Sequence, residues 1–193
     1  MSTQRLEAFS DAVIAIIMTI MVLELRIPEG ASLASLQPLL PKLLSYVVSF
    51  VYLAIYWNNH HHMIHVTQRS NGAILWANMH LLFWLSLVPA TTAWLGANPS
   101  ANLPVAVYGI VLLLAAVSYF VLQNTIIRVE GESSRLRKMI GKDLKGKVSP
   151  VAYLVAIVLA FFAPVLSEAL YVLVALMWLV PDRRIESKLE QGA

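Results

Sequence analysis

Long apolar stretches separated by short polar links run through the whole chain. The first stretch, between Arg5 and Pro28, carries no charge from Ala12 to Leu23, and Thr19 is the only polar side chain in that interval. About 20 apolar residues are needed to cross a bilayer core of about 30 Å. We therefore predict that this stretch is a transmembrane helix.

The same pattern recurs to the end of the chain, and residues that favour turns divide the stretches at 28–30, 69–72 and 98–102. It predicts six transmembrane helices, at about 6–27, 39–62, 73–95, 104–127, 148–166 and 167–180. The sixth is short and follows the fifth almost directly, with Glu168 expected at the turn between them. A basic hydrophilic link, 128–147, joins the fourth helix to the fifth. No internal repeat is visible, so residues 1–193 are predicted to form a single all-α membrane domain.

Composition agrees with this pattern. Hydrophobic residues make up 59% of the 193 residues and charged residues only 13%, whereas a soluble domain has about 25% charged residues. The first apolar stretch is too long for the core of a signal peptide, and we expect it to stay as the first helix. The chain has no cysteine, which excludes disulfides, thiolate catalysis and cysteine metal ligands.

The distribution of basic residues predicts the orientation in the membrane. With six crossings, nearly all of the 14 lysines and arginines fall on the side of the two termini, and the exceptions are Arg26 and Lys42. Cytoplasmic segments carry the excess of basic residues. Both termini are therefore predicted to be cytoplasmic, and the positive charge needs no nucleic-acid partner to explain it.

Polar residues mark the start of the first helix. Asp11 lies inside the first helical turns, and a carboxylate at the centre of a membrane helix costs about 2.5–3.5 kcal/mol on insertion scales unless it is paired or hydrated. Arg5 and Asp11 do not share a helix face. Asp11 should therefore find its partner on another helix or another chain.

Polar side chains of other predicted helices lie at the same membrane depth, and buried polar groups there need partners. We expect a network that holds the first helix against the second and third. Its members are Arg5, Ser10, Asp11, Asn59, His61, Asn78 and His80. His80 is interpreted mainly as a hydrogen-bonded packing residue.

Histidines at the end of the second helix raise a metal hypothesis. The histidines His60, His61, His62 and His65 include one i, i+4 pair and one i, i+3 pair, and a pair such as His61 and His65 could hold zinc with a third ligand. The alternative is a solvated run of histidines at the membrane interface. Because that helix offers no nearby carboxylate, we predict no metal site and no cofactor. Catalytic motifs are also lacking, so an enzyme is not expected.

The residues Ile16, Thr19, Ile20 and Leu23 share one face of the first helix. By periodicity alone, such a stripe indicates helix packing. The hydroxyl of Thr19 could coordinate an ion or bond back to the carbonyl of Ala15. Glu24 follows the stripe, either as a snorkelling residue or as a charge at the outer end.

The pattern Arg5-x-x-x-Phe9-Ser10-Asp11 at the start of the first helix resembles the RxxxFSD motif of the endosomal and lysosomal potassium channel family (transmembrane protein 175 type), in its prokaryotic form. The similarity extends to the second helix, which ends in the run 56–61, and to the third helix, in 75–78 and 85–89. The resemblance implies a homotetramer of six-helix chains in a prokaryotic plasma membrane. It also implies that Phe9 is a packing anchor.

On this resemblance, the first helices of the homotetramer line a central pore that conducts potassium and other monovalent cations passively. Ile16, Ile20 and Leu23 would form an apolar constriction, Thr19 would offer ion coordination, and Glu24 would line an outer vestibule. An apolar ring dewets and favours the more weakly hydrated ion. We therefore expect a weak preference for potassium over sodium.

Two other interpretations remain open. A secondary transporter would use Asp11 and His80 as proton or cation sites, but transporters commonly show repeats and interrupted helices, which the first helix lacks. A metal-handling membrane protein would use the histidines from His60 to His65.

Overall fold

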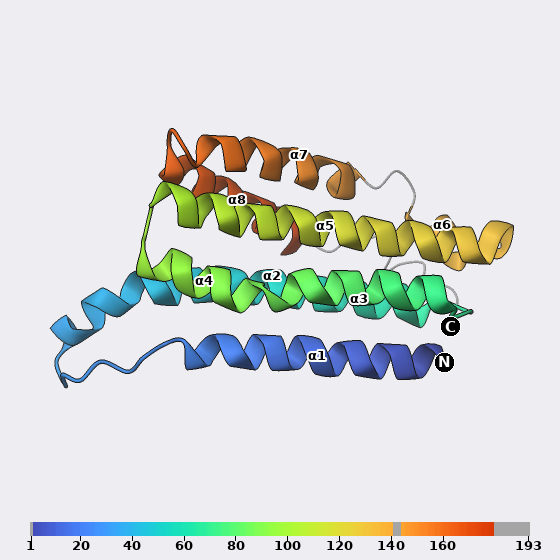
Figure 1. The fold of residues 1–193 in the computed structure, drawn as a ribbon, viewed down its shortest axis with the longest axis horizontal. Helices are drawn as coiled ribbons and strands as arrows, with labels where there is room; N and C mark the ends of the chain where they lie inside the picture. Colours follow the sequence, from blue (N-terminus) through green and yellow to red (C-terminus); the bar gives the residue numbers. More distant parts are fainter. Residues whose placement is uncertain (1, 141–143, 180–193) are drawn as a thin grey trace.

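The computed structural model describes residues 2–140 and 144–179. Its α-helices are α1 (Thr3–Leu23), α2 (Leu40–His65), α3 (Gly72–Ser86), α4 (Val88–Ala97), α5 (Asn102–Glu130), α6 (Arg135–Ile140), α7 (Leu144–Leu159) and α8 (Pro164–Leu179), with the 3-10 helices η1 (Leu33–Leu39) and η2 (Gly131–Ser133). Figure 1 shows the long helices side by side in a bundle, with α1 along one edge and α7 along the opposite edge. Among the described residues there is no strand. The predicted all-helical fold class is confirmed.

The lengths of the helices support only part of the predicted number of membrane spans. Within the described residues, 4 segments are long and apolar enough to cross a bilayer, namely Thr3–Leu23, Leu33–His65, Gly72–Ala97 and Asn102–Ser133. The helices α7 and α8 have 16 residues each, fewer than the about 20 that a straight crossing needs. Length and composition therefore support the first four predicted spans, and a six-span chain stays a prediction.

Two predicted helix boundaries were wrong near prolines. The first helix ends at Leu23 rather than at 27, and the amide of Glu24 closes it by bonding the Met21 and Val22 carbonyls. The third predicted helix divides into α3 and α4 at Leu87. Pro89 lacks an amide hydrogen, so it cannot donate to the carbonyl four residues earlier.

The turn between the last two helices also lies elsewhere than predicted. It occupies residues 160–163, and Pro164 begins α8, because proline is well suited to the first turn of a helix. The hydroxyl of Ser167 donates to the Ala156 carbonyl at 2.7 Å and ties the two helices together. Glu168 therefore lies on α8, where its carboxylate accepts bonds from the amide and the hydroxyl of Ser100.

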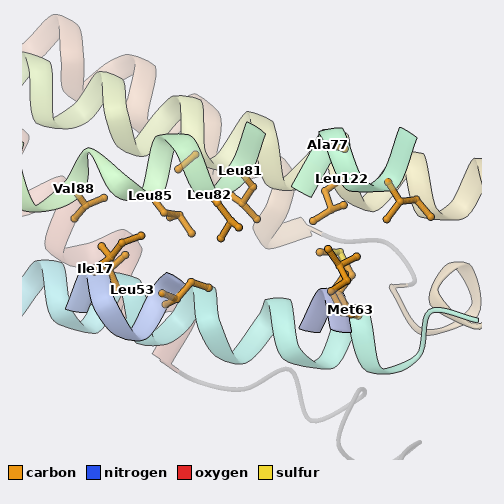
Figure 2. Close-up of a cluster of buried hydrophobic side chains, with 14 of the residues drawn as sticks. Ile17, Leu53, Met63, Ala77, Leu81, Leu82, Leu85, Val88 and Leu122 are labelled. Carbon is orange, nitrogen blue, oxygen red and sulfur yellow. The ribbon is translucent and has the colours of Figure 1, made fainter. Parts of the chain in front are cut away.

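The apolar core has two parts. One joins α1, α2, α3, α4, α5 and α6, and Figure 2 shows Ile17 of α1 directed at Leu85 and Val88 across this cluster. The other joins α2, α4, α5, α7 and α8 and contains four buried tyrosines, Tyr52, Tyr108, Tyr153 and Tyr171. Helices α2, α4 and α5 contribute to each part. They therefore form the centre of the chain, and α1 packs against one side of it.

Close approach of α5 to α8 depends on Gly109. A Cβ atom there would overlap the phenol of Tyr171, whose hydroxyl donates to the Val105 carbonyl at 3.1 Å. The absence of a side chain thus lets a buried tyrosine lie against the α5 backbone, where its hydroxyl finds an acceptor, as a polar group at membrane depth requires.

Candidate pore-lining helix and its polar anchor

Helix α1 has one covered face and one open face. The covered face consists of Leu6, Ser10, Ile14, Ile17 and Met21, and it packs on α2, α3 and α4. Spacings of three and four residues place these side chains on one stripe. The exposed fraction is 0% for Ile14 and 4% for Ile17, but 57% for Ile16 and 77% for Leu23. Within residues 2–140 and 144–179, an apolar face of a long membrane helix is thus without cover.

The predicted stripe of Ile16, Thr19, Ile20 and Leu23 lies on this open face, and all four residues are exposed. The Thr19 hydroxyl donates to the carbonyl of Ile16 at 2.9 Å, not to that of Ala15. A hydroxyl that donates in this way keeps its lone pairs to accept a hydrogen bond or to coordinate a cation. Glu24 is the C-cap of α1 and is also exposed.

A buried chain of hydrogen bonds holds the covered face in place. The side-chain amide of Asn78, on α3, donates to Ser10 Oγ at 2.9 Å, and Asn78 Oδ1 lies 2.7 Å from Nε2 of His60, on α2. Because the amide oxygen can only accept, Nε2 carries the proton, and Nδ1 of His60 is buried with no partner among the described residues. All three residues are fully buried. One small cluster therefore fixes α1 against two other helices.

A second set of contacts lies beside it. The indole of Trp57 donates to Asp11 Oδ1 at 3.0 Å, so the aspartate finds its partner on α2. One turn earlier on α1, Glu7 Oε1 lies 2.9 Å from Nδ1 of His61. Both contacts join α1 to the same stretch of α2.

Three residues of the predicted network and the predicted packing anchor Phe9 lie outside these contacts. Arg5 is exposed, and so is Phe9, whose exposed fraction of 46% contradicts a packing role within the chain. Asn59 donates to the carbonyl of Ile55 on its own helix. His80 is exposed and accepts from the indole of Trp84. Asp11 and His80 thus have separate partners, Trp57 on α2 and Trp84 on α3.

Sequence reasoning missed Glu7 and Trp57 as members of this region, and it named His60 only as one of a run of histidines. Glu7 precedes Asp11 by four residues, so both carboxylates share a face of α1. That spacing was the available signal for Glu7. Nothing in the order of residues singles out His60 from its neighbouring histidines, because the rotation of α2 decides which one turns inward.

The sequence profile described as endosomal/lysosomal potassium channel TMEM175 matches residues 5–89. A potassium channel of Chryseobacterium sp. (strain P1-3) is 54% identical over 192 residues, which cover 100% of both chains. The chain belongs to the TMEM175 family. This is a family of channels, not an enzyme class, in agreement with the predicted absence of catalysis.

Other TMEM175 relatives extend the similarity. A potassium channel of Chamaesiphon minutus is 30% identical over 177 residues, covering 86% of this chain and 87% of the relative. The crystal structure of a lysosomal potassium-selective channel TMEM175 homolog from Chamaesiphon minutus superposes with a TM-score of 0.79 at 29% identity, over 92% of this chain and 96% of that one. The likeness thus includes α7 and α8, beyond the matched residues 5–89.

Proposed function

We propose that this chain is a potassium channel of the TMEM175 family that conducts passively through a pore lined by α1. The observation that carries the proposal is the one-sided burial of α1, with an apolar stripe exposed opposite the face that packs on the bundle. An isolated chain gives this face no protein neighbour within the described residues. Copies of α1 around a common axis would provide one.

The pore model assigns the exposed stripe to a constriction. Rings of Ile16, Ile20 and Leu23 would give a narrow apolar passage that dewets, and a weakly hydrated cation crosses it at a lower dehydration cost. This supports a modest preference for potassium over sodium. The Thr19 hydroxyl, exposed beside Ile16, would offer oxygen ligands between these rings. Exposed Glu24 would concentrate cations at the outer mouth.

The assembly and its placement complete the proposal. The chain would form a homotetramer in a prokaryotic plasma membrane, with both termini in the cytoplasm. In Figure 1, α7 and α8 run along the bundle beside α5, which supports a six-crossing chain in which this hairpin makes the last two crossings.

The test measures potassium, sodium and caesium flux into liposomes that contain the purified protein. Wild type should pass potassium along its gradient without a proton gradient. Replacing Ile16 with Asn should hydrate the constriction and raise sodium flux relative to potassium flux. Ile110→Asn is the matched control, because Ile110 is also exposed on an apolar helix, α5, and lies outside the proposed pore.

Either of two results would contradict the proposal. If Ile16→Asn conducts with unchanged ion preference, Ile16 does not line the constriction. If flux requires a coupled proton gradient, the chain is a secondary transporter instead. A mass measurement of the detergent complex tests the assembly separately, and a single chain would exclude a pore between copies of α1.

A further inference from the structure

The region where α1 meets the histidines of α2 holds a group of side chains that the pore proposal does not use. Ligand atoms of Glu7, Asp11 and His61 all lie within 4.8 Å of one another. The His61 Nδ1 atom is 2.9 Å from Glu7 Oε1. We infer that these three residues form a binding site for a divalent transition ion of the zinc class, at the N-terminal end of α1.

Charge favours a cation at this position. Glu7 and Asp11 are four residues apart on one helix face, where like charges repel. Across residues 2–140 and 144–179, no lysine or arginine forms an ion pair with either carboxylate, and the ion-pair partner of Glu7 is His61. A divalent cation would relieve this repulsion.

Ligand chemistry selects the class of ion. One imidazole nitrogen with two carboxylate oxygens suits zinc and similar first-row metals, and three protein ligands leave a position for water. When ligand atoms lie about 2.0–2.1 Å from a tetrahedral zinc, they are about 3.3 Å from one another. Modest rotation of the three side chains would therefore bring their ligand atoms to these distances. The side chains of His61 and Glu7 are 40% and 17% exposed, which gives an ion access from solution.

Neighbouring groups hold the ligands in position. The Trp57 indole donates to Asp11 Oδ1 at 3.0 Å, and hydrogen bonds of this kind orient metal ligands. The His61 ring stacks between Trp57 and His65, with ring centroids 6.1 Å and 5.8 Å away. Since the ligands come from α1 and α2, a bound ion would fasten the two helices together.

The test is zinc binding to the full-length purified protein with any affinity tag removed, by equilibrium dialysis with elemental analysis. Cobalt(II) absorption in the visible range is a second readout of ligand geometry. We expect one zinc per chain, and both Glu7→Gln and His61→Asn should weaken binding by at least about tenfold, the scale of loss when even outer groups of a metal site are removed. The two variants remove different ligands, and each must elute like wild type.

Matched controls are Glu29→Gln and His80→Asn, which remove an exposed carboxylate and an exposed histidine elsewhere, and both should bind as wild type does. His65→Asn separates this site from a site in the histidine run. Unchanged affinity in Glu7→Gln, with loss in His65→Asn, would place the ion on the histidines of α2 and overturn the inference. Absence of stoichiometric binding would also overturn it. Neither result depends on conduction, so the potassium-channel proposal would stand or fall separately.

Discussion

Helices α1 and α5 have similar composition and different surroundings. The mean hydropathy of their most apolar windows is 2.1 and 2.5, yet 28% of the window is buried in α1 and 50% in α5. Helix α5 packs on α3, α4, α7 and α8, whereas α1 packs on α2, α3 and α4 from one side only. An apolar helix at the edge of a bundle needs either lipid or another protein surface on its open face. The difference therefore directs attention to what α1 meets outside the chain.

Thiol labelling distinguishes a lipid-facing from a water-facing surface on α1. Of the predictions here, it should give the largest effect. The chain has no native cysteine, so Ile16→Cys, Leu23→Cys and Ile110→Cys each carry a single thiol. A charged methanethiosulfonate reagent reacts with the thiolate, which forms in water. We expect labelling and loss of potassium flux for the two α1 variants and neither for Ile110→Cys. If all three thiols are equally protected from the reagent, the open face of α1 contacts lipid.

Loss of the polar anchor should have the next largest effect. Asn78→Leu removes the amide that donates to Ser10 and the amide oxygen that accepts from His60. Each buried polar group left unpaired costs about 1–3 kcal/mol of stability. The variant should lose thermal stability and assemble poorly, as measured by size-exclusion chromatography after heating. Asn124→Leu is the control, because the Asn124 amide donates to the Phe120 carbonyl of its own helix. Equal stability of the two variants would show that the anchor does not hold α1.

The same comparison can be tested on the α5 side. Gly109→Ala places a methyl group against Tyr171, and overpacking of this kind costs about 1–3 kcal/mol. Thermal stability should fall through the α5–α8 contact, with ion preference unchanged in the molecules that remain assembled. At Gly72, a Cβ atom would meet nothing within 4 Å, so Gly72→Ala should melt like wild type. A change of ion preference in Gly109→Ala would place α5 in the conduction path.

The smallest effect is expected at the outer end of α1. Glu24→Gln should lower potassium flux modestly at low ionic strength, because it removes the charge that attracts cations to the mouth. The difference from wild type should disappear at about 1 M salt, where the Debye length is about 3 Å. Glu29→Gln, in the exposed link that follows, is the control. A deficit that persists at high salt would assign Glu24 a direct structural role.

The sequence predicted the helices and the site to different extents. Apolar length located α1, α2 and α5 to within a few residues, because a bilayer imposes a minimum helix length. Local proline chemistry, at Pro89 and Pro164, decided breaks that hydropathy did not mark. Periodicity also identified the stripe of Ile16, Ile20 and Leu23, but it could not tell whether that face is buried, since both faces of α1 are apolar.

The sequence by itself determined that this is a helical membrane protein, that its first helix begins with a polar motif, and that no cysteine chemistry is available. Only the tertiary structure decided which polar groups meet. Spacing fixes the face of one helix on which a side chain lies, but not how neighbouring helices rotate or slide against it. That rotation turned His60 toward Asn78, left His80 outside, and brought His61 to the two carboxylates of α1. The histidine run of α2 has no carboxylate on its own helix, but it lies against two carboxylates of α1, because packing joins residues far apart in the chain.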